Sequence, residues 1–589
     1  MFRCLRLSIF RPLKNCPPRP LPAQLPPVAN SIFLQQRNAH LSSIMSAPNK
    51  TFHKGPKRQK RDKPKRKEKV HELDEVLQND IDKLLKKNKP DADADSADEA
   101  STTPQPTLPE PFTEMEVTVA ELSSTGDGLA LSENGDHVYV VPFTVPGDKA
   151  LVKVVRHVKP LSYSVTDFLK VIEPGPLRND DAIGCKYFGK CSGCQLQMMS
   201  YEDQLVHKKR IVEKAYANFS GLIPELIPAI QDTFPSPKQY GYRTKLTPHF
   251  PAPAGRGTTP GEYLETPPIG FTFKNQRRHL DIEDCPLGTD IIREGLKSER
   301  KRVAENLTKY KRGATILLRE TTTRTPKETT PSTDAGTTTA PKAPIAYESL
   351  NKPHQESGDE ITTEFPSYTE TKRCVTDQNA TSGEYIDDYL FTNKAGAFFQ
   401  NNNSILSGFT EYIRQHALSN PAMQPNADSS NPATTPIKYL LDAYSGSGLF
   451  TITLSPLFKS SLGVDVAGDS IVSARENAKA NNLPNTGFAA ADAAVLFKDV
   501  PYPADQTLLV IDPPRKGCSE DFLRQMLEYG PRRVVYVSCN VHTQARDVAV
   551  MVQGDGKTGV RYEIESIRGF DFFPQTGHVE GVAVLNKVV

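Results

Sequence analysis

The chain has 589 residues, too many for one ordinary domain of roughly 100–200 residues, so about three domains with linkers are expected. Its nine cysteines are scattered, which argues against a disulfide-stapled secreted scaffold, and no run of about 18 apolar residues occurs, which excludes a membrane-spanning helix. The net charge of +2 hides an asymmetry, because residues 1–69 hold 17 Lys and Arg against two acids, a net of +15 that leaves −13 for the remainder.

Residues 1–110 are predicted to form a mostly disordered basic tail, apart from a helix around His71–Lys87. The first 44 residues bear arginine and no acid, which is typical of a mitochondrial transit peptide. Met45 offers a second start that would discard this segment but keep the basic block Lys54–Lys69, which is typical of nuclear-localisation signals and of contacts to RNA phosphates. We therefore expect a mitochondrial product, a nuclear or cytosolic product, or both from two starts. For the basic block, the alternative is a solvated tail without a targeting role. For the two products, the alternative is a single start at Met45 with an untranslated upstream stretch.

Residues 112–174 carry short apolar strands separated by glycine turns. Val117 and Val119 alternate with polar residues, Gly126-Asp127-Gly128 supplies a turn, and Leu151–Val155 gives a further strand. Strands of this length and spacing predict a small OB-like β barrel. The segment resembles a TRAM domain, which implies RNA binding; a β module without a ligand is the alternative.

Residues 175–400 are expected to form a central domain around a cysteine cluster. Three cysteines stand within ten residues, and a fourth follows much later in an Asp-Cys-Pro sequence: Cys185, Cys191, Cys194 and Cys285. Four soft thiolates suit an iron–sulfur cluster or zinc. A single C-x2-C pair is unlike a zinc ribbon, and four protein thiolates would close the coordination, so a structural or electron-transfer role is favoured over substrate chemistry. We favour a [4Fe–4S] cluster, with zinc or free buried thiols as alternatives.

Three segments lack the apolar periodicity needed to bury one face. Residues 251–266 are rich in Pro, Gly and Thr, and residues 320–370 are rich in Thr and Pro. Residues 418–436 are rich in Asn, Pro and Ser. Each is predicted to be an unpacked surface insertion or linker.

Residues 401–589 alternate predicted strands and helices, which predicts an α/β domain with a doubly wound, Rossmann-like parallel sheet. The strand Ile437–Asp442 leads into the glycine turn 445–448, and the next strand ends in Asp465, 19 residues after Gly446. A strand, a glycine turn and a following acid form the corner where a nucleotide approaches the backbone and its ribose hydroxyls meet a carboxylate. The site is therefore expected at the carboxyl ends of the strands.

Further chemistry is predicted at the same edge of the sheet. Asp512-Pro-Pro-Arg515 ends one predicted strand, Cys539 ends the next, and Glu580 lies close to the C-terminus. A lone cysteine is most often a small buried residue. A nucleophilic thiol, an acid and a ligand-binding Asp around one nucleotide corner instead predict an active site.

Five motifs in this order resemble those of the SAM-dependent RNA uracil-5-methyltransferases, and most of all the fungal-type tRNA (uracil-5-)-methyltransferases. The resemblance covers about residues 112–589 without the insertions. The motifs are Phe398-Phe-Gln-Asn-Asn402, Asp442-Ala-Tyr-Ser-Gly-Ser-Gly448, Asp512-Pro-Pro-Arg515, Ser538-Cys-Asn540 and Phe573-Pro-Gln-Thr-Gly-His-Val-Glu580.

The resemblance implies S-adenosyl-L-methionine (SAM)-dependent methylation of uridine C5 in tRNA, in the T loop, through a covalent bond to C6. It implies Cys539 as nucleophile and Glu580 as general base. SAM would be held by four residues, Gln400, Tyr444, Asp465 and Asp512. The four cysteines match the cluster of the iron–sulfur members of the family. RNA is the expected partner, with no membrane and no obligate protein partner.

The sequence departs from the family pattern at four positions. Val541 stands where Pro is usual, and Ser445 stands where Cys is frequent. Leu449 replaces an Asn and cannot donate its hydrogen bond, and Asp465 replaces the more frequent Glu.

Three alternative functions stay open. They are the same reaction on ribosomal RNA, mitochondrial rRNA included, an RNA-binding module without catalysis, and an amino-group methyltransferase. The intact Cys539 and Glu580 argue against the second, and the nucleophilic cysteine argues against the third.

Overall fold

The computed structural model describes residues 72–88, 108–158, 162–253, 262–327, 360–418, 436–492, 496–497 and 500–588. All of them belong to one compact unit, Lys69–Val589. The predicted transit segment, Met45 and the block Lys54–Lys69 lie outside the described residues, as do parts of all three predicted insertions. Within the described ranges, no helix is both long and apolar enough to cross a membrane.

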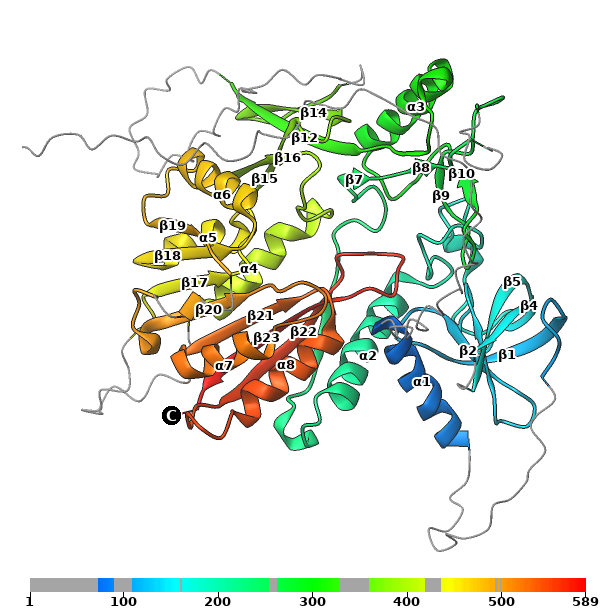
Figure 1. Cartoon of the computed structure of the whole chain (residues 1–589), viewed down its shortest axis with the longest axis horizontal. Coiled ribbons are helices and arrows are strands. Elements are labelled where there is room, and N and C mark those ends of the chain that lie inside the picture. The colour runs from blue at the N-terminus through cyan, green and yellow to red at the C-terminus, as the bar shows by residue number, and fades with distance from the viewer. Residues whose placement is uncertain are drawn as a thin grey trace, which may run out of the picture. The chain divides into compact units, whose positions relative to one another are not determined.

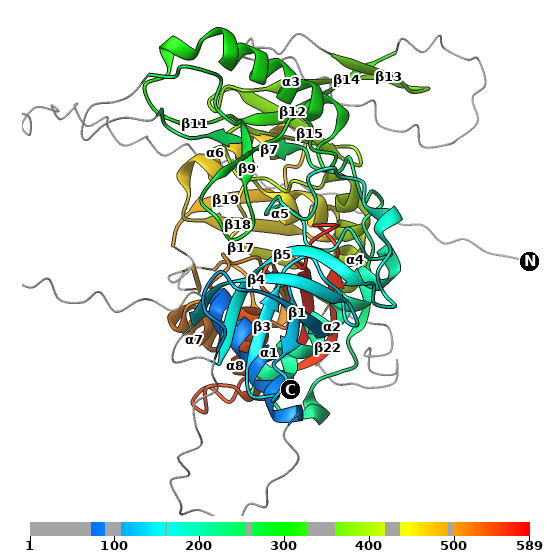
Figure 2. The ribbon, with the colours of Figure 1, turned by 90° about the vertical axis from the view of Figure 1, so that its right-hand side faces the viewer.

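The N-terminal part of the unit is a helix beside a closed five-stranded barrel, in the segment where the sequence predicts a β barrel (Figure 2). The elements are α1 (Glu72–Asn88), β1 (Glu114–Leu122), β2 (Gly128–Leu131), β3 (Val138–Val141), β4 (Lys149–Val158) and β5 (Tyr163–Glu173). Buried and exposed side chains alternate along β1 and β4, which gives the barrel an apolar interior. At Gly128 a Cβ atom would lie 2.3 Å from Thr144 Oγ1, so this position needs glycine.

Helix α1 confirms the helix predicted around residues 71–87, but it is not part of a disordered tail. Its Ile81 and Leu84 are buried in one cluster with Leu129, Val140 and Tyr163 of the barrel. Burying this apolar stripe stabilises the helix, because an isolated helix of this length is marginal in water.

The middle of the chain forms small sheets around one helix. Two four-stranded sheets have the orders β10-β9-β8-β11 and β13-β14-β12-β7, and β15 pairs with β16 as a hairpin. Their elements are β7 (Lys245–Leu246), β8 (His249–Phe250), β9 (Gly270–Thr272), β10 (His279–Asp281), α3 (Asp290–Glu305), β11 (Ala314–Thr315), β12 (Leu318–Pro326), β13 (Ile361–Glu364), β14 (Tyr368–Val375), β15 (Thr381–Ile386) and β16 (Tyr389–Lys394).

The prediction that residues 320–370 form an unpacked insertion is wrong at both ends of this range. Residues 320–326 belong to β12, which pairs antiparallel with β14 over Arg319–Pro326, and β13 pairs on the far side of β14. A run of threonines carries no apolar periodicity, yet threonine is β-branched and suits a strand.

The C-terminal part is an eight-stranded sheet with helices on both faces, which confirms the α/β class (Figure 1). Its order is β19-β18-β17-β20-β21-β23-β22-β6, parallel from β19 to β21, with β23 antiparallel to both of its neighbours. Its strands are β6 (Gln231–Phe234), β17 (Tyr439–Ala443), β18 (Ser460–Asp465), β19 (Thr486–Ala490), β20 (Thr507–Ile511), β21 (Arg533–Ser538), β22 (Tyr562–Phe570) and β23 (Glu580–Lys587). Its helices are α2 (Tyr201–Phe219), α4 (Leu406–Ala417), α5 (Leu449–Leu454), α6 (Gly468–Ala480), α7 (Glu520–Tyr529) and α8 (Val541–Gln553).

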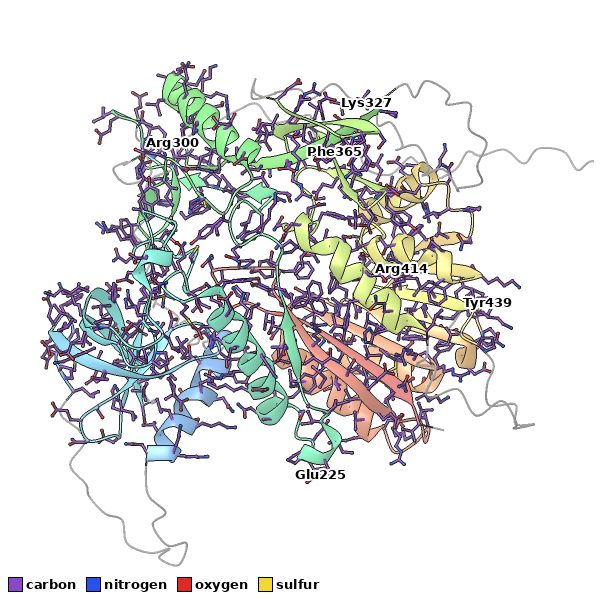
Figure 3. The ribbon with its side chains drawn as sticks, turned by 180° about the vertical axis from the view of Figure 1, so that it is seen from behind. Glu225, Arg300, Lys327, Phe365, Arg414 and Tyr439 are labelled. Carbon is purple, nitrogen blue, oxygen red and sulfur yellow. The ribbon has the colours of Figure 1, made fainter. Side chains whose placement is uncertain are left out.

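The alternation of side chains along the strands divides the core into two layers. Leu509 and Ile511 of β20 pack in one cluster with α2, α7 and α8, whereas Leu508 and Val510 pack in another with α4, α5 and α6. The second side faces the viewer in Figure 3, where Arg414 marks α4. Both faces of the sheet are therefore covered, as a doubly wound sheet requires.

The predicted division at residue 400/401 does not separate the elements of this sheet. Strand β6 pairs with β22 at the sheet edge, and α2 packs against α8. Both come from the segment predicted as a separate central domain, and neither carries a local signal for such a distant partner.

Candidate active site

The first strand end of the site is the glycine turn after β17. Tyr444 has a φ of +63°, Gly446 a φ of +54° and Gly448 a φ of +93°. A Cβ atom at Gly446 would meet nothing within 4 Å, so open space lies over its backbone. This turn is a cradle in which a nucleotide-like ligand can approach the main chain closely.

Asp465 closes this turn from the end of β18. Its carboxylate accepts hydrogen bonds from Gly446 N at 3.0 Å and from Ala467 N at 2.7 Å, and the side chain is half-buried. The acid and the glycine turn therefore lie together, as their spacing predicts. The carboxylate has further lone pairs for ribose hydroxyls.

Asp442, at the same edge, has a structural role that the sequence did not reveal. Its Oδ2 accepts hydrogen bonds from Thr451 N at 2.9 Å and from Thr451 Oγ1 at 2.5 Å, which anchors the first turn of α5 to β17. The residue is fully buried, and burial raises the pKa of this carboxyl to about 7. Its Oδ1 has no hydrogen-bond partner among the described residues.

Cys539, Asp512 and Glu580 form the reactive end of the site. Burial raises the pKa of the Cys539 thiol to about 12, and the nearby Glu580 and Asp512 carboxylates add to this, while Arg515 opposes them. Burial and Asp512 raise the pKa of Glu580 well above its usual range, and burial together with Asp442 raises that of Asp512 to about 7. Glu580 is buried and Asp512 and Cys539 are half-buried, and the negative charge of each carboxylate disfavours ionisation of the groups beside it.

The turn that carries Cys539 is tied to the turn that carries Asp512 and Arg515. Asn540 caps α8 by accepting a hydrogen bond from His542 N at 3.2 Å, and its Nδ2 donates to Arg515 O at 3.1 Å. Thr543 Oγ1 donates to the same carbonyl at 3.0 Å. Two hydrogen bonds therefore join the two strand ends directly. Val541, which replaces the usual proline, is the first residue of α8 and is buried in the core.

Two predicted ligands remain, Tyr444 in the glycine turn and Gln400 in the segment after β16. Tyr444 is half-buried and packs against Phe522, with ring centroids 5.4 Å apart. Gln400 is half-buried after β16, and its side chain makes no hydrogen bond within the described ranges. Its neighbour Asn402 donates to Phe572 O at 3.2 Å, which joins the Gln400 segment to the loop that precedes Glu580.

The sequence reasoning missed a set of buried residues behind Glu580. Lys208 and Asp571 form a fully buried ion pair, and Gln204 is hydrogen-bonded to Gln575. Gln575 lies within a quoted motif, but nothing local marks Gln204 and Lys208 of α2 as its partners.

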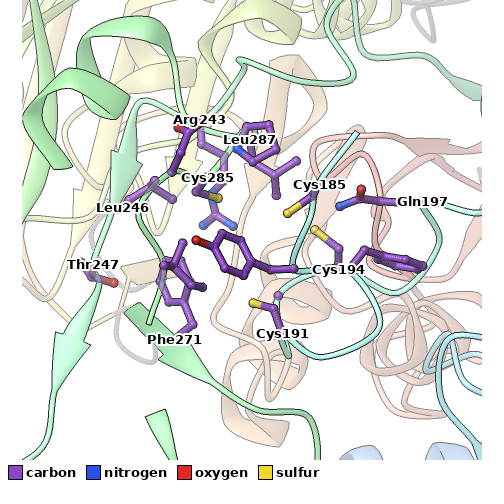
Figure 4. Close-up of a pocket in the computed structure, with 16 residues that line it drawn as sticks. Cys185, Cys191, Cys194, Gln197, Arg243, Leu246, Thr247, Phe271, Cys285 and Leu287 are labelled. Atoms are coloured by element: carbon purple, nitrogen blue, oxygen red, sulfur yellow. The ribbon is translucent and has the colours of Figure 1, made fainter. Parts of the chain in front are cut away.

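The four predicted metal-ligand cysteines line one pocket of about 160 Å³ (Figure 4). Burial raises the pKa of each of these thiols, and for three of them, Cys191, Cys194 and Cys285, the nearby thiols add to the shift. As they stand, no three His, Cys, Asp or Glu side chains in the described part of the chain form a group that could hold a metal ion. The donor chemistry fits a soft metal centre, but the sulfur atoms are not arranged as ligands.

This chain is similar to known proteins of a single family. A sequence model of the tRNA (Uracil-5-)-methyltransferase family matches residues 428–588. The chain is 41% identical to a Schizosaccharomyces pombe protein named tRNA (uracil(54)-C(5))-methyltransferase, over 100% of this chain and 96% of that protein. A Saccharomyces cerevisiae protein of the same name is 39% identical, over 80% of this chain and 73% of that protein.

A solved structure shares the fold. It is the Pyrococcus abyssi tRNA (uracil-54, C5)-methyltransferase in complex with S-adenosyl-L-homocysteine, with a TM-score of 0.51 and 23% identity. The match covers 80% of this chain and 100% of that chain.

Proposed function

Because this chain belongs to the tRNA (uracil-5-)-methyltransferase family, we propose that it methylates C5 of a uridine in tRNA with SAM as the methyl donor. The observation that carries this proposal is the convergence of Cys539, Glu580 and Asp512 at one strand edge beside the glycine turn. The two fungal relatives are named for uracil 54, which supports a T-loop uridine as the target.

Cys539 is the proposed nucleophile. Its thiolate forms a bond to C6 of uracil, and the electron pair of the C5–C6 double bond moves toward O4, so that C5 becomes electron-rich. Bound SAM supplies an electrophilic methyl group, which C5 takes as S-adenosyl-L-homocysteine leaves. Burial and the two carboxylates raise the pKa of the Cys539 thiol to about 12, so its ionisation needs the opposing positive charge of Arg515.

Glu580 is the proposed base for the second half of the reaction. Its carboxylate takes the C5 proton, the double bond re-forms, and the C6–S bond breaks to return the Cys539 thiolate. A carboxyl with a raised pKa is a stronger base when ionised, which suits removal of a carbon-bound proton.

The donor site is proposed around the glycine turn. The open space over Gly446 and the half-buried carboxylate of Asp465 suit the nucleoside, with Tyr444, Gln400 and Asp512 completing the walls. Arg515 is exposed and follows Asp512 by three residues in the chain, so it is placed to contact RNA phosphates.

We assign RNA binding to the barrel, as a TRAM-like module. A target base in a folded tRNA must leave its stack to reach Cys539, so the RNA needs a second platform beyond the active site. Ultraviolet crosslinking of bound tRNA followed by peptide mapping checks this assignment. Crosslinks confined to residues outside 114–173 would contradict it.

A methylation assay tests the central proposal. Purified protein, SAM and an unmodified tRNA transcript should yield 5-methyluridine at one uridine of the T loop, located by nuclease digestion and mass spectrometry. A ribosomal RNA fragment serves as the comparison substrate. Product in the rRNA and none in the tRNA would refute the proposed substrate, and no product in either would refute the activity.

We further propose that the four cysteines hold a [4Fe–4S] cluster. The support is their gathering around one pocket and their soft donor chemistry, with adjustment of the side chains needed to bring the sulfur atoms together. Anaerobically purified protein should contain about four irons and absorb broadly near ~400 nm. Replacing Cys185 and Cys194 by serine should remove the iron, whereas replacing Cys374, which is buried and does not line the pocket, should not. One zinc and no iron by elemental analysis would overturn the proposal.

The basic tail is proposed to direct the chain to two compartments. The acid-free first 44 residues favour mitochondrial import, and a start at Met45 keeps the block Lys54–Lys69 for nuclear entry or phosphate contacts. A reporter fused to residues 1–60 should give mitochondrial and nuclear or cytosolic signals, and Met45→Leu should leave only the mitochondrial one. A signal that is diffuse or only nuclear, unchanged by Met45→Leu, would contradict import.

A further inference from the structure

The loop 571–579 is the part of the sheet that connects β22 to Glu580. Phe570, the last residue of β22, pairs with Glu580, the first residue of β23, so the loop begins and ends beside the proposed base. The Glu580 side chain is only 2% exposed and sits at the first position of β23. Its position therefore depends on the main chain that carries it and on the walls around it.

Gln575 is the most constrained residue of this loop. It is not glycine, yet its φ is +71°. Its N donates to Gln204 Oε1 at 3.0 Å, its Oε1 accepts from Gln204 Nε2 at 3.0 Å, and its carbonyl accepts from Gln195 N at 2.9 Å and from Leu196 N at 3.1 Å. A left-handed conformation in a side-chain-bearing residue persists only where its surroundings over-determine it, and such sites cluster near function.

A second anchor holds the start of the loop to the same helix. Lys208 of α2 forms a buried ion pair with Asp571 and also donates to Phe573 O at 2.9 Å. Tyr201, in the first turn of α2, donates from its hydroxyl to Asp571 Oδ2 at 2.9 Å. Gln204 and Lys208 are one helical turn apart and face the same side, so α2 holds the loop at two points.

We infer that Gln204 and Lys208 are positioning residues for Glu580, which act by fixing the loop 571–579. The inference rests on the proposed function, because it assigns the step in which Glu580 takes the C5 proton. Elimination is the step most sensitive to this loop, since Cys539 lies on a different strand end and is held independently through Asn540 and Thr543. Loosening the loop should therefore slow release of the covalent intermediate more than its formation.

Gln204→Leu is the test variant, because it removes both hydrogen bonds to Gln575 at nearly constant volume and leaves no buried charge. Ile211→Val is the matched control: it is buried on the same helix, and its apolar side chain makes none of the hydrogen bonds or ion pairs that hold the loop. Gln204→Asn, which shortens the amide by one methylene, is a milder second variant should the first fail to fold. Single-turnover reactions with SAM and labelled tRNA transcript are followed on denaturing gels for covalent adduct and by mass spectrometry for 5-methyluridine.

We expect Gln204→Leu to accumulate adduct and to release product on the order of 10²-fold more slowly, with KM for tRNA unchanged. Gln204→Asn should show the same pattern at smaller size, and Ile211→Val should release product as the wild type does. Adduct and product that fall together, in step with a lowered Tm, would overturn the inference, as would unchanged kcat in both Gln204 variants. Wild-type 5-methyluridine in the same assay tests the proposed function separately, so the two failures are distinguishable.

Discussion

Cys539→Ala should abolish methyl transfer, with the single-turnover rate falling on the order of 10⁴-fold or more while tRNA affinity changes little. Without a thiolate at C6 the uracil ring has no electron-rich C5, and neither Glu580 nor the bound donor can substitute for that bond. The residue is half-buried and contributes one small side chain, so loss of RNA contacts is not expected. Cys539→Ser should be nearly as inactive, because an alcohol ionises far less readily than a thiol at neutral pH.

The measurements are 5-methyluridine by mass spectrometry and tRNA binding by filter retention. Cys518→Ala is the matched control, because Cys518 is a second free thiol, buried in the loop between β20 and α7, and its Sγ lies 3.8 Å from the hydroxyl of Tyr536. It should keep most of its activity. Full turnover by Cys539→Ala would rule out the covalent mechanism.

The edge of the sheet could be predicted from the sequence because its signals are local. A strand, a glycine turn and an acid 19 residues later place Gly446 and Asp465 together by the geometry of one parallel strand pair, and the structure joins them by a hydrogen bond of 3.0 Å. The same holds for Cys539 and Asp512, each of which follows an apolar strand. Parallel strands bring their carboxyl ends to one edge wherever they occur.

The contacts between α2 and the loop that precedes Glu580 could not be predicted, because they join residues far apart in the chain. Gln204 and Gln575 are 371 positions apart, and a buried polar residue on an amphipathic helix carries no sign of which partner satisfies it. The pairing of β6 with β22 also has no signal in the sequence, because its register is irregular and only two residue pairs define it.

The protonation state of the Cys539 thiol is a second feature that the residue types alone could not predict. Arg515 next to Cys539 suggests a lowered thiol pKa, but the structure places two carboxylates and a buried environment against it, and the balance raises the pKa. Distances and burial decide this balance, and neither can be read from sequence spacing.

Glu580→Gln should trap the covalent RNA–protein adduct. Attack by Cys539 and methyl transfer need no base at C5, so both can proceed, but the amide cannot take the C5 proton and elimination should slow on the order of 10²–10⁴-fold. In the wild type, only ionised Glu580 accepts the proton, and its pKa is raised well above the usual carboxyl range by burial and by Asp512. Release of the intermediate should therefore speed up as pH rises and then level off, whereas the slow release by Glu580→Gln should not depend on pH in this way.

A denaturing gel with end-labelled tRNA and SAM separates the adduct from free RNA. Glu565→Gln is the matched control, because Glu565 lies in β22, the neighbour of β23, where it pairs with Arg533 rather than with a reactive group. That variant should form product without accumulating adduct. Free turnover by Glu580→Gln with no adduct, at any pH, would place the base on another residue. Adduct that persists in Glu580→Gln and disappears in the double variant with Cys539→Ala would identify Cys539 as the protein partner of the bond.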